Sequence, residues 1–203
     1  MIARYGSVAA EMAVCAKAAG LVDRSGWSLM AIEGPAPLLA HVLEVAVPDS
    51  VPEPGTAACV AGTWCCRVSP DRAVVAGMPS AVARWRQVTG RAIAGAGLAV
   101  TARPVSGGTA LSVVGPRAAR VLELAGLPAD LPLDGVVAGH VVHTPAIIVH
   151  EEHDHFLLLL EGGELEPVWH ALLDAGRDLG ISPVGTEALD RLAAAGRNHS
   201  GEH

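Results

Sequence analysis

Apolar residues recur at helical spacing in six stretches of the chain. The clearest is residues 79–94, where Val82, Trp85 and Val88 fall on one side and a proline occupies the first turn. Gly20 follows the first stretch and marks its C-terminal end. The helices predicted in this way are residues 9–19, 37–45, 79–94, 117–124, 166–179 and 186–195.

Shorter apolar runs, bounded by Gly, Pro and Asp, predict β-strands. Residues 69–72 read Ser-Pro-Asp-Arg, which is typical of a tight turn and joins two of the strands into a hairpin. Proline-rich residues 47–55 and 127–135 are predicted to be loops. The predicted strands are residues 27–33, 63–68, 73–76, 109–114, 140–143, 146–149 and 156–160.

One unit, a strand followed by Gly-Pro and a helix, occurs twice. Residues 29–36 read LMAIEGPA and residues 111–118 read LSVVGPRA. Proline cannot continue a strand ladder and its fixed φ suits a first helical turn, so the dipeptide switches strand to helix. Two such units imply a duplicated α+β fold with mostly antiparallel sheets. We expect one unit, residues 1–197, of two intertwined lobes (about 1–100 and 101–197), and a disordered tail, residues 198–203.

Composition and charge exclude several classes of function. The 203 residues are 51% hydrophobic and 17% charged, which supports a large core and opposes intrinsic disorder. The net charge of −7 opposes binding to nucleic acids or anionic membranes, because both need a basic surface. The longest apolar runs are too short to span a bilayer, and no secretory signal is visible at the N-terminus. We therefore expect a cytoplasmic protein.

Four stretches, in order along nearly the whole chain, carry a further pattern. They are Tyr5-Gly6-Ser7 with Glu11 and residues 19–25 (AGLVDRS); residues 32–36 (IEGPA); residues 113–118 (VVGPRA) with Val121 and Leu122; and Trp169, residues 172–176 and 179–185 (LGISPVG), with Ala188 and Leu192. In this order they resemble the T-protein (aminomethyltransferase) family of the glycine cleavage system. The resemblance implies a T-protein-like folate-binding core, with tetrahydrofolate as ligand and Trp64 placed to line a flat pterin ring.

The chain departs from that family at the catalytic motifs. Residues 56–60 (TAACV) contain no acid where the family's enzymes carry an Asp-rich strand, and residues 150–156 (HEEHDHF) replace a Gly-Tyr-Thr-Gly-Glu motif. The C-terminal barrel domain and the Lys-Gly-Cys-Tyr motif of the iron–sulfur-assembly branch have no counterpart. In size and missing motifs the chain resembles the short gamma subunit of heterotetrameric sarcosine oxidase. This resemblance implies a non-catalytic subunit, held by a larger subunit in a folate-linked amine-oxidising or one-carbon-transfer complex.

Histidines gather near the C-terminal third of the chain, where five of the nine lie between residues 140 and 155. Imidazole and carboxylate groups suit Zn²⁺, Ni²⁺ or Cu²⁺. The candidate ligands of a metal or haem are His143, His150, His153 and His155. The competing interpretation is a solvated polar turn at residues 151–154, because no three-ligand template such as H-E-x-x-H is present.

Three functions are consistent with the sequence. The first is the non-catalytic subunit. The second is a small enzyme, either a folate-dependent methyl or aminomethyl transferase or a metal or haem enzyme that uses the histidines. The third is self-association, in which a second copy covers apolar surface that the missing barrel leaves exposed. Asp23 and Arg24 are interpreted as a capping or mutually neutralising pair at the start of a strand.

Overall fold

The structure is a computed structural model that describes residues 2–152 and 154–199. Its α-helices are α1 (Val8–Lys17), α2 (Ala36–Ala46), α3 (Pro79–Ala96), α4 (Ala118–Leu124), α5 (Leu165–Ala175) and α6 (Thr186–His199), with one 3-10 turn at Arg177–Leu179. Its strands are β1 (Ala19–Asp23), β2 (Ser28–Glu33), β3 (Thr56–Val60), β4 (Thr63–Ser69), β5 (Arg72–Gly77), β6 (Thr101–Pro104), β7 (Gly108–Val114), β8 (Val136–Val141), β9 (Thr144–Glu152), β10 (His155–Glu161) and β11 (Ile181–Val184).

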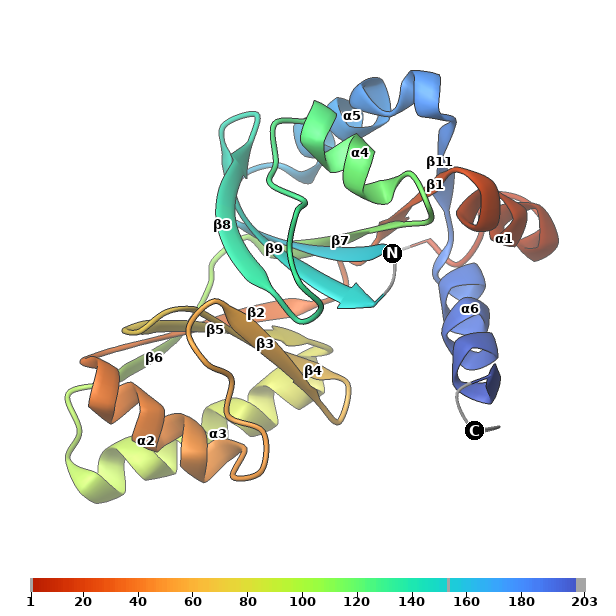
Figure 1. Cartoon of the computed structure of the whole chain (residues 1–203). Coiled ribbons are helices and arrows are strands. Elements are labelled where there is room, and N and C mark those ends of the chain that lie inside the picture. The colour runs from red at the N-terminus through yellow and green to blue at the C-terminus, as the bar shows by residue number, and fades with distance from the viewer. Residues whose placement is uncertain (1, 153, 200–203) are drawn as a thin grey trace.

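Two sheets pack face to face, and helices cover their outer faces (Figure 1). Sheet A has the strand order β11-β1-β7-β10-β9-β8, and sheet B has the order β3-β4-β5-β2-β6. Helices α4 and α5 lie on sheet A, while α2 and α3 lie on sheet B. Every named strand pair is antiparallel except β1 with β11. The predicted α+β fold with mostly antiparallel sheets is confirmed.

Strand β10 shows why one apolar run is continuous rather than alternating. Leu157 and Leu159 point into the core between the two sheets. Phe156, Leu158 and Leu160 point the other way, into the core beneath α4 and α5. Because both faces of this strand are buried, both sets of positions must be apolar. The same two-sided burial fixes the register that positions the polar residues at the end of the strand.

The two Gly-Pro units occupy equivalent places in different sheets. Gly34-Pro35 connects β2 to α2 on sheet B, and Gly115-Pro116 connects β7 to α4 on sheet A. Each glycine lies against the backbone of another segment. A Cβ at Gly115, which has φ +120°, would lie 2.5 Å from the carbonyl oxygen of Cys15 in α1. Glycine is therefore required there both for conformation and for space.

Each sheet includes a strand from both sides of residue 100. Residues 19–23 form β1 inside sheet A, and residues 101–104 form β6 inside sheet B, so the chain crosses between the lobes twice. Helix α6 also includes residues 198 and 199, which were expected to belong to the tail, and residues 200–203 lie outside the described part. None of the described helices is both long and apolar enough to cross a membrane.

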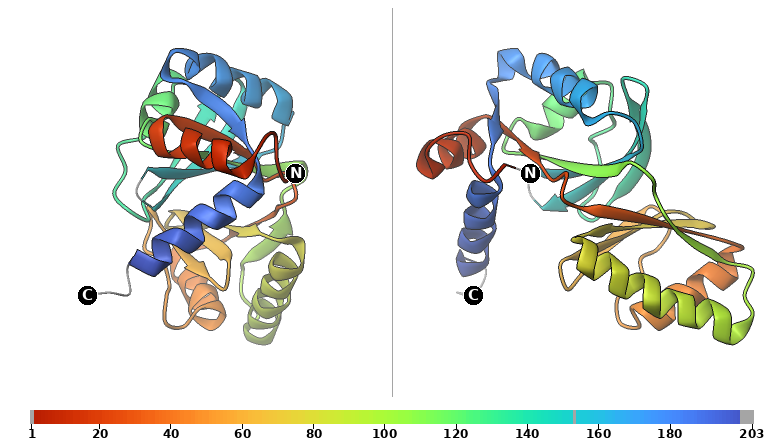
Figure 2. Two further views of the ribbon diagram at one scale, coloured as in Figure 1. Left: turned by 90° about the vertical axis from the view of Figure 1, so that its right-hand side faces the viewer. Right: turned by 180° about the vertical axis from the view of Figure 1, so that it is seen from behind.

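Glu11 fixes the N-terminal segment against the start of α6. One carboxylate oxygen accepts the backbone N–H groups of Tyr5 and Gly6 at 2.6 Å each, and the other accepts that of Gly185 at 2.9 Å. Burial opposes ionisation, but these hydrogen bonds hold the pKa of Glu11 below its ordinary value. The Glu11 side chain thereby links residues 5–6 to Gly185. It keeps α1 and α6 together at one end of the molecule (Figure 2).

Candidate functional site

A cleft of about 500 Å³ opens where one end of the two-sheet core meets α1 and α6. Sheet A contributes polar side chains, sheet B contributes the first β3–β4 hairpin, and the two terminal helices form an apolar wall. The lining residues with charged, thiol, imidazole or aromatic side chains are Cys15, Arg24, Cys59, Trp64, Glu151, Glu152, Asp154 and His155.

Strand register explains why polar groups meet at this end. Ile147 and Val149 of β9 point into the core between the sheets, and Glu151 is next on the same face. His155 pairs with Val114 of β7, at the same end of sheet A. Arg24 directly follows β1, and its backbone N–H donates to the carbonyl oxygen of Ala110, four residues along β7 from Val114, so only its side chain extends back to this end. The inward-facing series is therefore apolar in the middle of the sheet and polar at its end.

Arg24, Glu151 and His155 form a compact charged group. The Arg24 nitrogens Nη1 and Nη2 lie 3.4 Å from Oε1 and Oε2 of Glu151. His155 Nε2 lies 2.8 Å from Oε2 of the same carboxylate. Arg24 is only 9% exposed and Glu151 only 8%. A buried charge of this kind is tolerated because it is paired and hydrogen-bonded.

The surroundings of Glu151 favour its ionised form. Burial by itself would raise the pKa of this carboxyl group. The hydrogen bond from His155, the positive charge of Arg24 and a hydrogen bond from the Trp64 side chain outweigh burial and lower the pKa. Arg24 also lies over the ring of Trp27, 4.6 Å from its centroid, which adds a cation–π contact. The carboxylate is therefore held in place by groups from both sheets.

The two thiols in the cleft are not activated. Burial, and then the negative charge of Glu151, raise the pKa of Cys59. Burial, and then the charge of Glu11, raise the pKa of Cys15 to about 11. Because the thiolate is the reactive form of cysteine, neither group is poised as a nucleophile at neutral pH.

The residues predicted from sequence fall in different places. Trp64 lines the cleft, as does His155. His150 lies on the other face of sheet A, where its Nδ1 is 2.9 Å from the carbonyl oxygen of Leu131 and its ring stacks on Phe156 at 4.7 Å between centroids. His153 lies outside the described residues.

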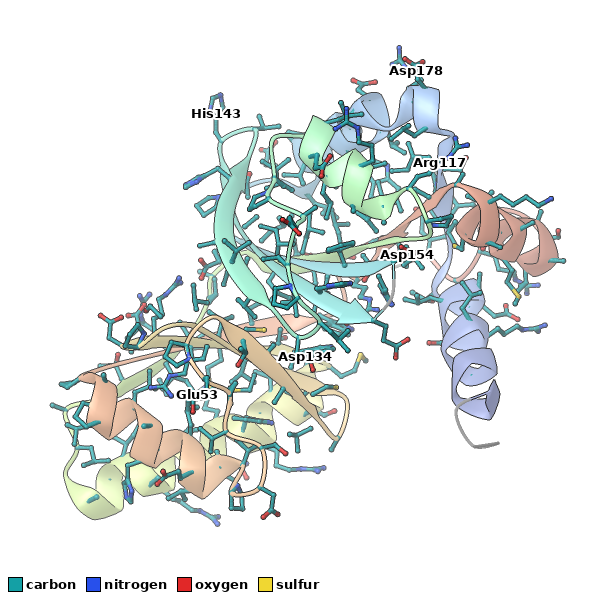
Figure 3. The ribbon with its side chains drawn as sticks, viewed as in Figure 1. Glu53, Arg117, Asp134, His143, Asp154 and Asp178 are labelled. Carbon is teal, nitrogen blue, oxygen red and sulfur yellow. The ribbon has the colours of Figure 1, made fainter. Side chains whose placement is uncertain are left out.

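The predicted histidine ligands do not converge among the described residues. His143 is exposed in the turn between β8 and β9, whereas His155 follows the turn at the other end of β9. Figure 3 shows this separation, with His143 at one tip of the sheet and Asp154 at the opposite end. At about 3.3 Å per residue, the nine residues of β9 place these turns roughly 25 Å apart. No group of three potential metal ligands occurs in the described part of the chain.

Two members of the charged group were not predicted from sequence. The sequence pattern favours a solvated turn at Glu151, but β9 extends through Glu152 and buries Glu151. Arg24 was paired with its neighbour Asp23, whose carboxylate instead accepts the backbone N–H of Ser25 at 2.7 Å. Glu151 can be identified from the alternation of side chains along β9: it lies two residues after Val149 and four after Ile147, and both of these point into the core between the sheets.

Comparison with known proteins gives results at the level of fold. Neither a family model nor a curated protein matches the sequence. The solved structure of glycine cleavage system aminomethyltransferase T from Bartonella henselae is 21% identical, with a TM-score of 0.71. The match covers 90% of this chain and 52% of that one, so this chain spans about half its length.

A second solved structure matches at nearly its full length. It is a chain of heterotetrameric sarcosine oxidase from Corynebacterium sp. U-96, in complex with pyrrole 2-carboxylate, at 18% identity and a TM-score of 0.62. The match covers 87% of this chain and 94% of that one. The chain therefore has the fold shared by the glycine cleavage T-protein and a sarcosine oxidase subunit, as the four ordered stretches of its sequence predict.

Proposed function

We propose that the chain is a non-catalytic, T-protein-like subunit of a larger amine-oxidising or one-carbon-transfer complex. The observation that carries the proposal is the engagement of Glu151, the buried carboxylate of the cleft, whereas Glu152 and Asp154, which also line it, are exposed. A general base needs a free lone pair within reach of its substrate. Both oxygens of this carboxylate instead face Arg24, and one also meets His155. The length match to a chain of a heterotetrameric enzyme supports a larger partner subunit.

Tetrahydrofolate is the ligand that the family resemblance implies, and the cleft fits it only in part. A volume of about 500 Å³ is within the range of small-molecule sites, and Trp64 supplies an aromatic wall for a flat ring. The buried carboxylate does not fit, because its acceptor positions are already used within the chain. We therefore derive no catalytic step through folate and propose that the cleft is a folate-site remnant.

Native mass spectrometry of the tagged protein, purified from its own organism, tests the subunit proposal. We expect a stoichiometric complex with a larger polypeptide, whose identity would also name the reaction. A lone monomer contradicts the proposal, and a homodimer without a larger chain supports self-association instead. The same spectrum reports any small-molecule mass that is retained by the chain.

A small folate-dependent methyl or aminomethyl transferase is the second candidate, favoured by the position of Trp64 in the cleft. The two functions differ in calorimetric titration of the isolated chain with tetrahydrofolate. The subunit proposal predicts no saturable binding in the micromolar range. Micromolar binding that is lost in Trp64→Ala supports the transferase, provided that Trp169→Ala retains it. Trp169 is a matched control because it lies on α5 and stacks with Tyr5, away from the cleft lining.

A further inference from the structure

The acceptor positions of Glu151 are filled by the chain itself. The two terminal nitrogens of Arg24 donate one hydrogen bond to each carboxylate oxygen, at 3.4 Å each. His155 Nε2 lies 2.8 Å from one of these oxygens, and Trp64 lines the same cleft. A carboxylate offers about four lone-pair positions. The three contacts from Arg24 and His155 therefore occupy most of these positions, and the forked position is taken while Arg24 is in place.

Arg24 lies in the cleft in the way that a bound cation would. Its guanidinium group is between a carboxylate and an aromatic face, that of Trp27. Both arrangements are general means of binding planar cations, because a fork of N–H groups matches a carboxylate and the ring face attracts positive charge. The backbone of Arg24 lies just beyond β1, so only the side chain extends to this position.

We infer that the Glu151 end of the cleft is a binding site for planar cations of the guanidinium or amidinium class, and that Arg24 is its resident occupant. An external ligand of this class reaches Glu151 only when the Arg24 side chain is displaced. The inference concerns the isolated chain and needs no partner subunit. Its failure is therefore distinguishable from failure of the proposed function, which depends on co-purification of a larger polypeptide.

Removal of the Arg24 side chain should create a vacant site of defined chemistry. In Arg24→Ala the Glu151 carboxylate keeps His155 but loses the forked cation. Methylguanidinium restores both the charge and the planar pair of donors. Methylammonium restores the charge alone, because an ammonium group is a compact point charge without that fork. Comparison of the two cations thus separates recognition of shape from recognition of charge.

The experiment is a titration of Arg24→Ala with methylguanidinium chloride at constant ionic strength and below denaturing concentrations. Thermal unfolding and tryptophan fluorescence are the two readouts. We expect a saturable rise in Tm for Arg24→Ala, about tenfold weaker with methylammonium. The wild type and the double variant Arg24→Ala/Glu151→Gln should not respond. The matched control is Arg120→Ala, which removes a 61% exposed arginine that pairs with Glu123.

Two results would overturn the inference. One is a response of Arg24→Ala no larger than that of the wild type or Arg120→Ala. The other is equal binding of methylguanidinium and methylammonium, which would show a site for charge without the planar geometry. If Arg24→Ala does not fold, Arg24→Leu is titrated in the same way, because leucine keeps apolar packing against Trp27 and leaves the guanidinium position vacant.

Discussion

Replacement of Glu151 by Gln tests whether the buried carboxylate holds this end of the molecule together. The change keeps the size of the side chain and removes its charge, so Arg24 becomes a 9% exposed cation without an anion. Loss of one partner of a buried ion pair costs about 3–5 kcal/mol. The amide oxygen of Gln still accepts one hydrogen bond, so we expect the lower end, a loss of about 3 kcal/mol in the free energy of unfolding.

The measurement is urea unfolding at pH 7, followed by tryptophan fluorescence, within a double-mutant cycle. Glu151→Gln and Arg24→Met are made singly and together. The double variant should lose less stability than the sum of the single losses, because it leaves no buried charge without a partner. Glu166→Gln is the control: its side chain is 84% exposed in a 3.8 Å pair with His170, and its change should stay within about 0.5 kcal/mol.

Acid unfolding gives the same hypothesis an independent test. The pKa of Glu151 is lower in the folded than in the unfolded chain, where it is about 4.3. The carboxylate therefore contributes stability above that pH, and the contribution is lost as pH falls through the folded pKa. The unfolding free energy of the wild type should fall more steeply below about pH 4.5 than that of Glu151→Gln. Equal acid slopes, or a loss under about 0.5 kcal/mol at pH 7, would refute the reasoning.

Two further predictions concern backbone and core. Gly115→Ala should lose about 2–4 kcal/mol in urea unfolding, since its Cβ would lie 2.5 Å from the Cys15 carbonyl oxygen at φ +120°. Gly126→Ala, at φ +81° with nothing within 4 Å of the added Cβ, should lose only about 1 kcal/mol, and equal losses would contradict the close-approach argument. Leu158→Ala, in the fully buried core under α4 and α5, should lose about 2–5 kcal/mol by thermal or urea unfolding. Leu133→Ala, 55% exposed, should change stability by less than about 0.5 kcal/mol, and a similar loss at both sites would argue against this placement of the core.

The repeated strand and helix units could be predicted because their signals are local. A Gly-Pro dipeptide acts on its own neighbours, so the switches after β2 and β7 follow from a few residues of sequence. Helix α3 was predicted to within two residues because its apolar spacing extends over several turns. In these segments, local propensity and tertiary packing favour the same structure.

Four short strands were not predicted by pattern, and each is only four or five residues long: β1, β3, β6 and β11. Runs of this length carry too little periodicity to be distinguished from helix ends or loops. Their stability comes from neighbours that are distant in sequence. Ala19 pairs with Ile181 in the parallel β1–β11 ladder, for example. The placement of Ala19 in the first predicted helix, and the absence of a predicted strand over residues 20–23, have this physical cause.

The cleft was predicted in part, for a reason that lies in strand phase. Trp64 is predicted to line the cleft because the family resemblance implies a flat pterin ligand and this tryptophan lies on the first predicted hairpin. Glu151 was missed because residues 150–155 look like a polar turn when read without the strand before them. In phase with Ile147 and Val149, however, the carboxylate must enter the sheet interface.

A buried lone carboxylate would cost several kcal/mol, so its position requires a cation from another strand of the same sheet. Arg24, at the end of β1 and 127 residues away, meets that requirement. Neither residue is informative alone. An acid in phase with an inward-facing apolar series predicts a buried partner cation, but the register places the Arg24 backbone beside Ala110, so the identity of the partner follows only from the reach of its side chain.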